Sequence, residues 1–345
     1  MSDPPHQRRP RYRGTHPRRF DEKYKELAPE QYPDLVAHLR ERGHTPAGHH
    51  VPVLLEETLQ VLAVAPGQRG VDATLGWGGH AERLLERLSP GGCLLALDAD
   101  PIELPKTETR LRRLGFGDEV LLVRRTNFAG LPAAIAAAGW DDGADFVLAD
   151  LGVSSMQIDD PSRGFSFKHD GPLDMRMNPK RGFSAADWLV RAPLEALTAI
   201  LVAHADEPHA AEIAAMLSAQ RGTLATTRAL ADAVRAALEG RVADDDADLS
   251  VRRVFQALRI AVNDELGTLD ALLRELPWCL RPGGRAAIIT FHSGEDRRVK
   301  RALEAGLRAG HYSEVPREVV RASAAEQRAN PRAKSAKLRS VRRAT

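Results

Sequence analysis

Cysteines, long apolar runs and internal repeats are scarce or missing in this chain of 345 residues. Its two cysteines, Cys93 and Cys279, lie in or beside apolar segments without metal-ligand spacing, which argues against a disulfide framework or a zinc site. No run approaches the about eighteen apolar residues of a membrane helix. The arginines near the amino terminus precede no apolar core, which excludes a secretory or twin-arginine signal. We therefore expect a soluble, cytoplasmic protein with no membrane partner.

Charge is distributed unevenly, although the net charge is only +2. Residues 1–45 mix Pro, Arg, His and Gly without periodicity, which predicts a disordered basic arm. Residues 326–345 are basic and short in acids, which predicts a basic C-terminal tail. Each end fits either a solubilising segment or a contact with nucleic-acid phosphates, and charge alone leaves both open.

Between the two ends, apolar runs alternate with helical patterns. The expected elements are strand 70–73, helix 79–88, strand 93–98, helix 101–114, strand 120–124, helix 130–138 and strand 145–150. Strands that alternate with helices in this way predict an α/β fold with a parallel sheet.

The alternation stops after residue 150. Residues 151–182 have no period, which is typical of binding loops, and residues 184–240 read as alanine-rich helices of an inserted subdomain. One amphipathic helix is then expected over 254–276, before a late strand over 285–291 that returns to the sheet. The predicted boundaries are a first core part over 46–155, a substrate loop and helical subdomain over 156–250, and a second core part over 251–325.

Three of the apolar strands end on an acid, namely Asp72, Asp98 and Asp150. Ligands of open α/β sheets bind beyond the carboxyl ends of the strands, so we expect these acids to surround one pocket. A glycine loop over 76–79 follows the first acid and brings backbone amides close to a nucleotide-like ligand. Taken singly, each acid also fits a solvated strand end.

The ligand of this pocket has two candidates. Asp98 lies about twenty residues after the loop, where a carboxylate accepts hydrogen bonds from ribose hydroxyls, and this fits NAD and S-adenosylmethionine about equally. Asp72 favours S-adenosylmethionine, because an acid beside the loop suits a cationic amino acid better than a pyrophosphate.

The aperiodic segment after Asp150 offers small hydroxyl residues, aromatic faces and arginines. Phe165 and Phe167 are candidates to stack on a base, and Arg163 and Arg176 are candidates to contact phosphate. The alternative is a structural crossover with buried aromatics, which is the better interpretation for the two phenylalanines taken alone.

Several separated motifs occur in one order and span nearly everything after residue 49. They occupy residues 50–57, 78–80, 127–128, 150–177, 255–260, 291–297 and 330–335. Together they resemble the bacterial family that methylates the exocyclic N4 of a cytidine in small-subunit ribosomal RNA. The resemblance implies a class I S-adenosylmethionine-dependent methyltransferase core, with a Rossmann-like, mostly parallel sheet and a helical insertion. Carried over by position, the cofactor contacts would be Gly78, Gly79, His80, Asp98, Phe128, Asp150 and Gln157.

A few positions depart from the family pattern. Trp77 stands where arginine is common, Asn178 where aspartate often occurs, and Gly294 where leucine is usual. Residues 248–253 also replace a more usual His-Pro-Ala-Thr-Arg element that bears on RNA contact. None of these positions is a carried-over cofactor contact, so we expect an active enzyme.

The implied reaction moves a methyl group in line to nitrogen, which asks mainly for positioning and needs no metal. Asp150, or a backbone carbonyl near Leu151, is the candidate acceptor beside the amino group. His292 is the alternate catalytic candidate, for steering or proton removal, although it also fits a helix cap.

A target base within structured RNA must be splayed out and held by stacking. The candidates for stacking are Phe165, Phe167 and Phe291, and those for phosphate contact are Arg163, Arg176 and Arg297. The expected partner is an assembled or late-assembly small ribosomal subunit, and the sequence leaves monomer and homodimer open. Two rival functions remain: a methyltransferase for DNA cytosine N4, and a non-catalytic assembly factor that retains the fold.

Overall fold

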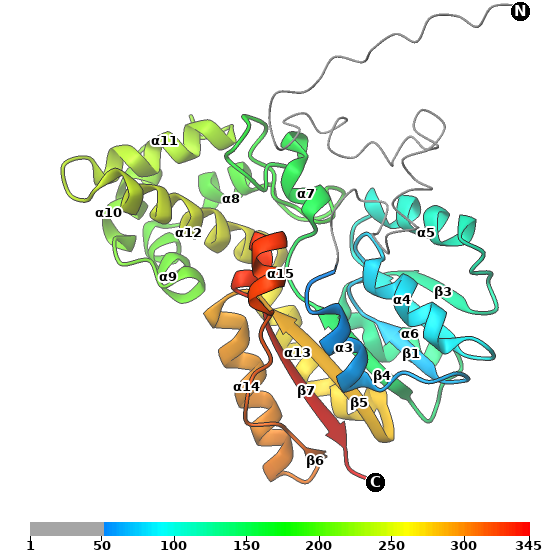
Figure 1. The fold of residues 1–345 in the computed structure, drawn as a ribbon. Coiled ribbons are helices and arrows are strands. Elements are labelled where there is room, and N and C mark those ends of the chain that lie inside the picture. Colours follow the sequence, from blue (N-terminus) through cyan, green and yellow to red (C-terminus); the bar gives the residue numbers. More distant parts are fainter. Residues whose placement is uncertain (1–51) are drawn as a thin grey trace, which may run out of the picture. The chain divides into compact units, whose positions relative to one another are not determined.

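The computed structural model describes residues 52–345, so the arm predicted over 1–45 lies outside the described residues. In the described part, seven strands form one sheet in the order β3-β2-β1-β4-β5-β7-β6 (Figure 1). The strands are β1 (Arg69–Asp72), β2 (Cys93–Asp98), β3 (Leu121–Arg125), β4 (Ala144–Asp150), β5 (Leu280–Thr290), β6 (Tyr312–Glu314) and β7 (Lys337–Arg343). Strands β1 to β5 pair in parallel, whereas β7 is antiparallel to both β5 and β6. The predicted Rossmann-like, mostly parallel sheet is confirmed.

Helices cover both faces of this sheet. Those of the core are α3 (Leu55–Leu62), α4 (Gly79–Leu88), α5 (Glu103–Arg113), α6 (Leu131–Ala137), α13 (Glu265–Cys279) and α14 (Ser293–Arg308). Side chains of a strand alternate between its faces. In β4, Val147 and Ala149 pack in the core with α6, α13 and α14, whereas Phe146 and Leu148 pack in the core with α3, α4 and α5.

The centre of the sheet contains one very close approach. A β-carbon on Gly70 of β1 would lie 2.0 Å from Cζ of Phe146, on the adjacent strand β4. Phe146 is fully buried, so its ring occupies the space beside the glycine. Glycine is therefore required at position 70 as long as phenylalanine is present at position 146.

An inserted group of helices separates β4 from β5. It consists of α8 (Ala185–Arg191), α9 (Leu194–Ala205), α10 (Ala210–Ala219), α11 (Thr227–Leu238) and α12 (Asp244–Asn263). These helices share a hydrophobic core of their own, and Figure 1 shows them grouped beside the sheet. The predicted helical insertion is confirmed; its boundaries at 156 and 250 stay a prediction.

The single helix predicted over 254–276 is wrong. Asp264, with φ of 48°, separates α12 from α13. Aspartate tolerates this left-handed conformation better than most residues. The apolar period continues across the break because both helices bury that side, so periodicity alone does not reveal it.

The C-terminal segment is part of the sheet rather than a tail. Strand β7 pairs with β5 over six residues, and its Leu338 and Val341 are buried. Lys337 Nζ and Arg339 Nε lie 2.8 and 2.7 Å from the carboxylate of Asp296 on α14. The prediction of a basic tail is corrected, because these two cations are used to hold the last strand.

The remaining short elements are α7 (Ser155–Asp159), α15 (Ala324–Ala329) and the 3₁₀ turns η2 (Phe128–Gly130), η3 (Pro161–Arg163) and η4 (Pro331–Lys334). None of the helices described over 52–345 combines the length and apolarity needed to cross a bilayer. Within the same residues, no group of His, Cys, Asp and Glu side chains is arranged to hold a metal ion.

Candidate active site

The strand register brings the three predicted acids to one edge of the sheet. Asp72 is level with Ala96 of β2 and Leu148 of β4, so Asp98 and Asp150 each lie two residues further along their strands. At about 3.3 Å per residue this extends them roughly 7 Å beyond Asp72. The chain passes from β1 to β2 on one side and returns to β4 on the other, which makes this edge the topological switch point of the sheet.

Burial changes the protonation of these acids. It raises the pKa of Asp72 to about 7, against the backbone N–H of Thr74 and with the added effect of the Asp98 charge. Burial raises the pKa of Asp150 to about 8, and the charges of Asp72 and Glu295 add to the rise. The pKa of Asp98 is also raised by burial. The cluster therefore favours a positively charged ligand, which would let these acids ionise.

Asp150 has one carboxylate oxygen that the described chain leaves unsatisfied. Its Oδ1 is buried without a hydrogen-bond partner among residues 52–345. Its Oδ2 lies 3.6 Å from Nδ1 of His80, and its backbone N–H donates to Oγ1 of Thr74 at 2.6 Å. Because buried polar atoms are normally paired, Oδ1 is an acceptor available to a ligand.

The glycine loop places His80 beside Asp150. Gly78 has φ of 79°, and a β-carbon there would lie 2.9 Å from Cγ2 of Thr107 on α5. A β-carbon on Gly79 would lie 2.5 Å from Pro52. His80 is buried at the start of α4, and burial lowers its pKa to about 4 although the carbonyl of Val53 opposes this. The imidazole is therefore neutral near pH 7.

Trp77, one of the departures from the family pattern, lies in this loop. The guanidinium of Arg110 on α5 stacks over its ring, with Cζ 5.1 Å from the ring centroid. Arg110 also donates to the carbonyl of Trp77 at 2.8 Å and pairs with Glu82 at 2.6 Å. Arg110 of α5 thus contacts both the ring and the backbone of Trp77 in the glycine loop.

Asp98 and Gln157 are both engaged by protein groups. Asp98 accepts hydrogen bonds from the backbone N–H of Gly76 at 2.8 Å and of Asp100 at 2.9 Å. Gln157 accepts from the N–H of Ser154 at 2.8 Å and donates to Asp100 at 2.7 Å. Asp100 is a residue that sequence reasoning missed, although its position two residues after Asp98 is a visible signal.

Of the residues predicted to contact RNA, two are buried and a third, Phe167, is partly buried against the core of the helical insertion. The side chain of Arg163 is only 7% exposed and donates to Asp100 at 2.8 Å, so its expected phosphate contact is replaced by a buried ion pair. Phe165 is buried in the core of the helical insertion. The ring of Phe167 lies 5.3 Å from that of Phe255. The interpretation of the two phenylalanines as packing residues describes this structure better than stacking.

The other three lie nearer the surface. Arg176 is half-buried and holds Asp174 through Nε and Nη2, both at 2.7 Å. Arg297 is exposed, with Nη2 3.6 Å from Asp206. Phe291 follows β5 directly, and a β-carbon on Gly152 would lie 3.8 Å from its ring. Among the predicted aromatics, Phe291 is therefore the one beside Gly152, two residues after Asp150.

Two further predicted residues have clear structural surroundings. Phe128 begins η2 and packs, partly buried, on the core that faces α6 and α13. His292 is the N-cap of α14: its Nδ1 accepts from the N–H of Glu295, and Glu295 accepts from the N–H of Phe291 at 2.9 Å. Burial raises the pKa of Glu295, but contact with His292 and the amide of Phe291 outweighs it, so the pKa is lowered overall. The cap is present; a catalytic role of His292 stays a prediction.

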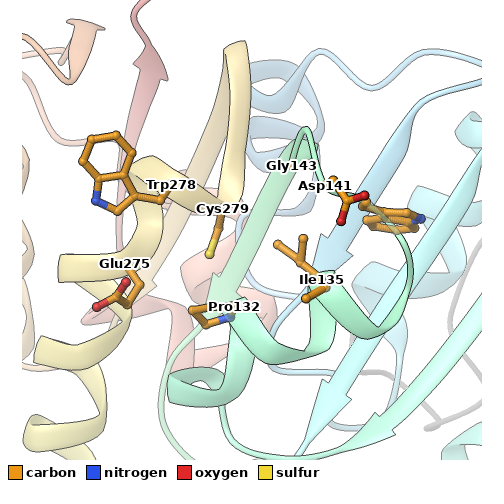
Figure 2. A pocket seen from close by; sticks show the side chains of 9 residues that line it. Pro132, Ile135, Asp141, Gly143, Glu275, Trp278 and Cys279 are labelled. Atoms are coloured by element: carbon orange, nitrogen blue, oxygen red, sulfur yellow. The ribbon is translucent and has the colours of Figure 1, made fainter.

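A separate pocket of about 210 Å³ lies at the opposite edge of the sheet. It is lined by Gly143 and Cys279, which directly precede β4 and β5, and by Trp278 (Figure 2). Because it lies at the amino ends of these strands, it is not the pocket that the three acids surround.

The sheet, the glycine loop and the acids at the switch point define an α/β domain built for a nucleotide-like cofactor. Residues 47–344 match the model of the MraW methylase family. The chain is 48% identical over 343 residues to "Ribosomal RNA small subunit methyltransferase H 1" of Lachnoclostridium phytofermentans, covering 98% of this chain and 93% of that protein. It is 46% identical over 340 residues to the protein of the same name from Agathobacter rectalis, covering 97% of each.

Similarity to solved structures is weaker. A putative rRNA-methylase from Clostridium thermocellum is 12% identical and has a TM-score of 0.41, covering 85% of this chain and 99% of that chain. On the match to the family model and to the curated relatives, the chain belongs to the MraW methylase family and is a methyltransferase.

Proposed function

We propose that this methyltransferase uses S-adenosylmethionine to methylate the exocyclic N4 of a cytidine in small-subunit ribosomal RNA. The names of its relatives support the RNA substrate, and the resemblance of its motifs supports the N4 position. The observation that carries the proposal is the unsatisfied, buried Oδ1 of Asp150 at the switch point of the sheet. The enzyme would act in the cytoplasm on an assembled or late-assembly small subunit.

The residues at this edge fit the cofactor. S-adenosylmethionine, when bound, supplies an electrophilic methyl group on a cationic sulfur. Buried acids with raised pKa values favour such a cation, and the glycine loop leaves backbone accessible beside them. Asp98 and Gln157 keep acceptor capacity, because each side-chain oxygen has a second lone pair. The proposed contacts are Gly78, Gly79, His80, Asp98, Phe128, Asp150 and Gln157.

Asp150 would act on the amino group of the substrate. The N4 lone pair of cytosine is delocalised into the ring, so an acceptor that takes an N–H of this group favours the pyramidal, nucleophilic form. Oδ1 of Asp150 is the proposed acceptor, while Oγ1 of Thr74 accepts from the backbone N–H of Asp150 and Nδ1 of His80 lies 3.6 Å from the other oxygen. The proton can leave after methyl transfer, with His292 as the alternate candidate for steering or proton removal.

The splayed base would stack on Phe291, which lies beside Gly152, two residues after Asp150. Arg176 and Arg297 remain proposed phosphate contacts, because both side chains reach solvent. Phe165 and Phe167 would support this surface from beneath, whereas Arg163 is turned inward onto Asp100.

The decisive experiment incubates purified enzyme with labelled S-adenosylmethionine and small ribosomal subunits from a strain that lacks the gene. We expect label in one cytidine, identified as N4-methylcytidine by mass spectrometry of the nucleosides.

Asp150→Asn keeps the size of the side chain but loses a charge-assisted acceptor, so turnover should fall about 10²-fold or more while cofactor affinity changes less. Asp98→Ala should instead weaken cofactor binding in a calorimetric titration.

The controls separate the rival functions. Asp142→Asn, an exposed acid away from this edge, should leave turnover unchanged. Label that appears only in duplex DNA would reverse the proposed substrate. Tight cofactor binding without any turnover on the subunits would favour a non-catalytic assembly factor. Unchanged cofactor affinity in Asp98→Ala would count against its ribose contact.

A further inference from the structure

Asp100 is a buried acid that the proposed chemistry does not use. It is 1% exposed and follows strand β2. Its Oδ1 accepts from the N–H of Ile102 at 2.8 Å, at the start of α5. Its Oδ2 accepts from Nε2 of Gln157 at 2.7 Å and from Nη1 of Arg163 at 2.8 Å. One carboxylate therefore joins the cofactor side of the sheet to the loop that follows β4.

Arg163 continues this connection toward the helical insertion. Its Nη2 donates to the carbonyls of Arg176 and Met177, both at 3.1 Å. Asn263, the last residue of α12, accepts from the N–H of Met177 at 2.7 Å and donates to the carbonyl of Met175 at 2.8 Å. The loop over 151–182 is thus fixed between Arg163 and the end of α12.

The other end of the connection is Asp98. Its Oδ1 accepts from the N–H of Asp100 at 2.9 Å, and its Oδ2 accepts from the N–H of Gly76 at 2.8 Å. Hydrogen bonds therefore run without a gap from the glycine loop to α12. A buried ion pair contributes little net stability, because desolvation offsets its attraction, whereas loss of one partner leaves a costly unpaired charge. Its main effect here is to fix the position of the loop relative to the acid.

We propose that Asp100 and Arg163 are positioning residues that couple cofactor binding at Asp98 to RNA binding at the loop over 151–182. This inference rests on the proposed function. When bound RNA holds the loop in place, the loop fixes the position of Arg163. Arg163 then fixes Asp100, and Asp100 fixes Asp98, the proposed ribose contact. By linkage, bound cofactor must tighten RNA binding by the same factor by which RNA tightens cofactor binding.

The test measures this factor directly. The affinity of unmethylated small ribosomal subunits for the enzyme is determined with and without saturating S-adenosylhomocysteine, which cannot react. The ratio of the two dissociation constants is the coupling factor, and we expect about tenfold for the wild type. In Arg163→Met we expect a ratio near one, with the subunit affinity of the free enzyme changed by less than about threefold.

Two companion variants keep the result interpretable. The double variant Asp100→Asn/Arg163→Met removes both charges, so no unpaired charge stays buried, and its ratio should also be near one even if Arg163→Met alone folds poorly. Arg112→Met breaks the two ion pairs of this α5 residue, with Glu108 and Asp118, which are not part of this path, and it should keep the wild-type ratio. A merely structural role would lower both affinities and leave the ratio unchanged.

The outcomes separate this inference from the proposed function. A wild type that methylates the subunits but has a ratio near one overturns the coupling alone. The coupling is likewise overturned if both Arg163 variants keep a tenfold ratio. Failure of the proposed function would instead show as absence of methylation by the wild type, whatever the ratio.

Discussion

Asp72 and Asp150 are the residues whose protonation the bound cation would change. Both are buried, and the charge of Asp72 adds to the raised pKa of Asp150. Among the other groups that face them, Asp98 has a pKa raised by burial, Glu295 has a lowered pKa, and the pKa of His80 is about 4. The two aspartates therefore titrate near neutral pH at this edge.

Cofactor affinity should consequently rise with pH. Below pH 7 the acids are protonated, and a cation must displace a proton before it can pair with them. Between pH 6 and 7.5 we expect affinity to increase by up to about tenfold per pH unit for each proton released. Calorimetry in buffers of different ionisation enthalpy counts these protons. Asp150→Asn should release about one proton fewer, and equal proton release in the variant would contradict this assignment.

The same shifts set the sign of the pH dependence of stability. In the unfolded chain these acids ionise near pH 4, whereas in the free folded protein they retain their protons until about pH 7 to 8. Their contribution to the free energy of unfolding is therefore fully present below about pH 4 and is lost as pH rises toward about 8.

At the scale of elements, strand β7 is held through Asp296 of α14, which pairs with Lys337 and Arg339. Burial raises the pKa of Asp296, but the two cations outweigh it, so the pKa is lowered overall. Asp296→Asn should lower the free energy of unfolding at pH 7 by about 1–3 kcal/mol.

This loss is expected to shrink as pH falls below about 4, because the carboxylate then takes up a proton in the unfolded chain before it does so in the native protein, where its pKa is lowered. Urea titrations at pH 7 and pH 3.5 measure it. Asp270→Asn is the matched control, because Asp270 of α13 forms an exposed ion pair with Arg298, which is on α14 like Asp296. This variant should lower the free energy of unfolding by less than about 1 kcal/mol. An equal cost for both variants would contradict the holding role of Asp296.

The strands were predictable from the sequence where burial on both faces decides the pattern of side chains. Strands β1, β2 and β4 are buried on both faces, so each reads as an apolar run that ends on an acid. Strand β7 has buried side chains only at Leu338 and Val341, and its other residues are mostly basic. Lys337 and Arg339 pair with Asp296, which is about forty residues earlier in the sequence, so the local sequence resembles a basic tail.

The site was predictable to a similar extent. The three acids and the glycine loop follow from strand ends, which local sequence reveals. The engagement of Arg163 and Gln157 by Asp100 joins positions 63 and 57 residues apart, and no local pattern marks such a partner. The burial of Arg163 was missed for the same reason.

At the scale of the whole molecule, the sheet and the helical insertion have separate hydrophobic cores. We expect them to open independently. Leu217→Ala, in the insertion core, should destabilise by about 2–5 kcal/mol and speed amide exchange in α9, α10 and α11 while the sheet stays protected. Hydrogen exchange followed by mass spectrometry reads this out segment by segment.

The matched variant is Leu84→Ala, an equally buried leucine of α4 in the core with the sheet. Leu84→Ala should speed amide exchange in β1 and β2 and should weaken cofactor binding. Leu217→Ala should leave both the exchange of these strands and cofactor binding unchanged. Uniformly faster exchange in both variants would mean that the two parts unfold as one cooperative unit.

The close approach of Gly70 to Phe146 constrains how this chain can evolve. A β-carbon at position 70 would lie 2.0 Å from the phenylalanine ring, so there is no room for a larger side chain at position 70 while phenylalanine is present at position 146. A larger residue at position 70 is tolerated only in a lineage that has already accepted a smaller one at position 146, and that intermediate carries a void at the centre of the sheet. The two positions are therefore epistatic, because whether a substitution at one of them is tolerated depends on the residue present at the other.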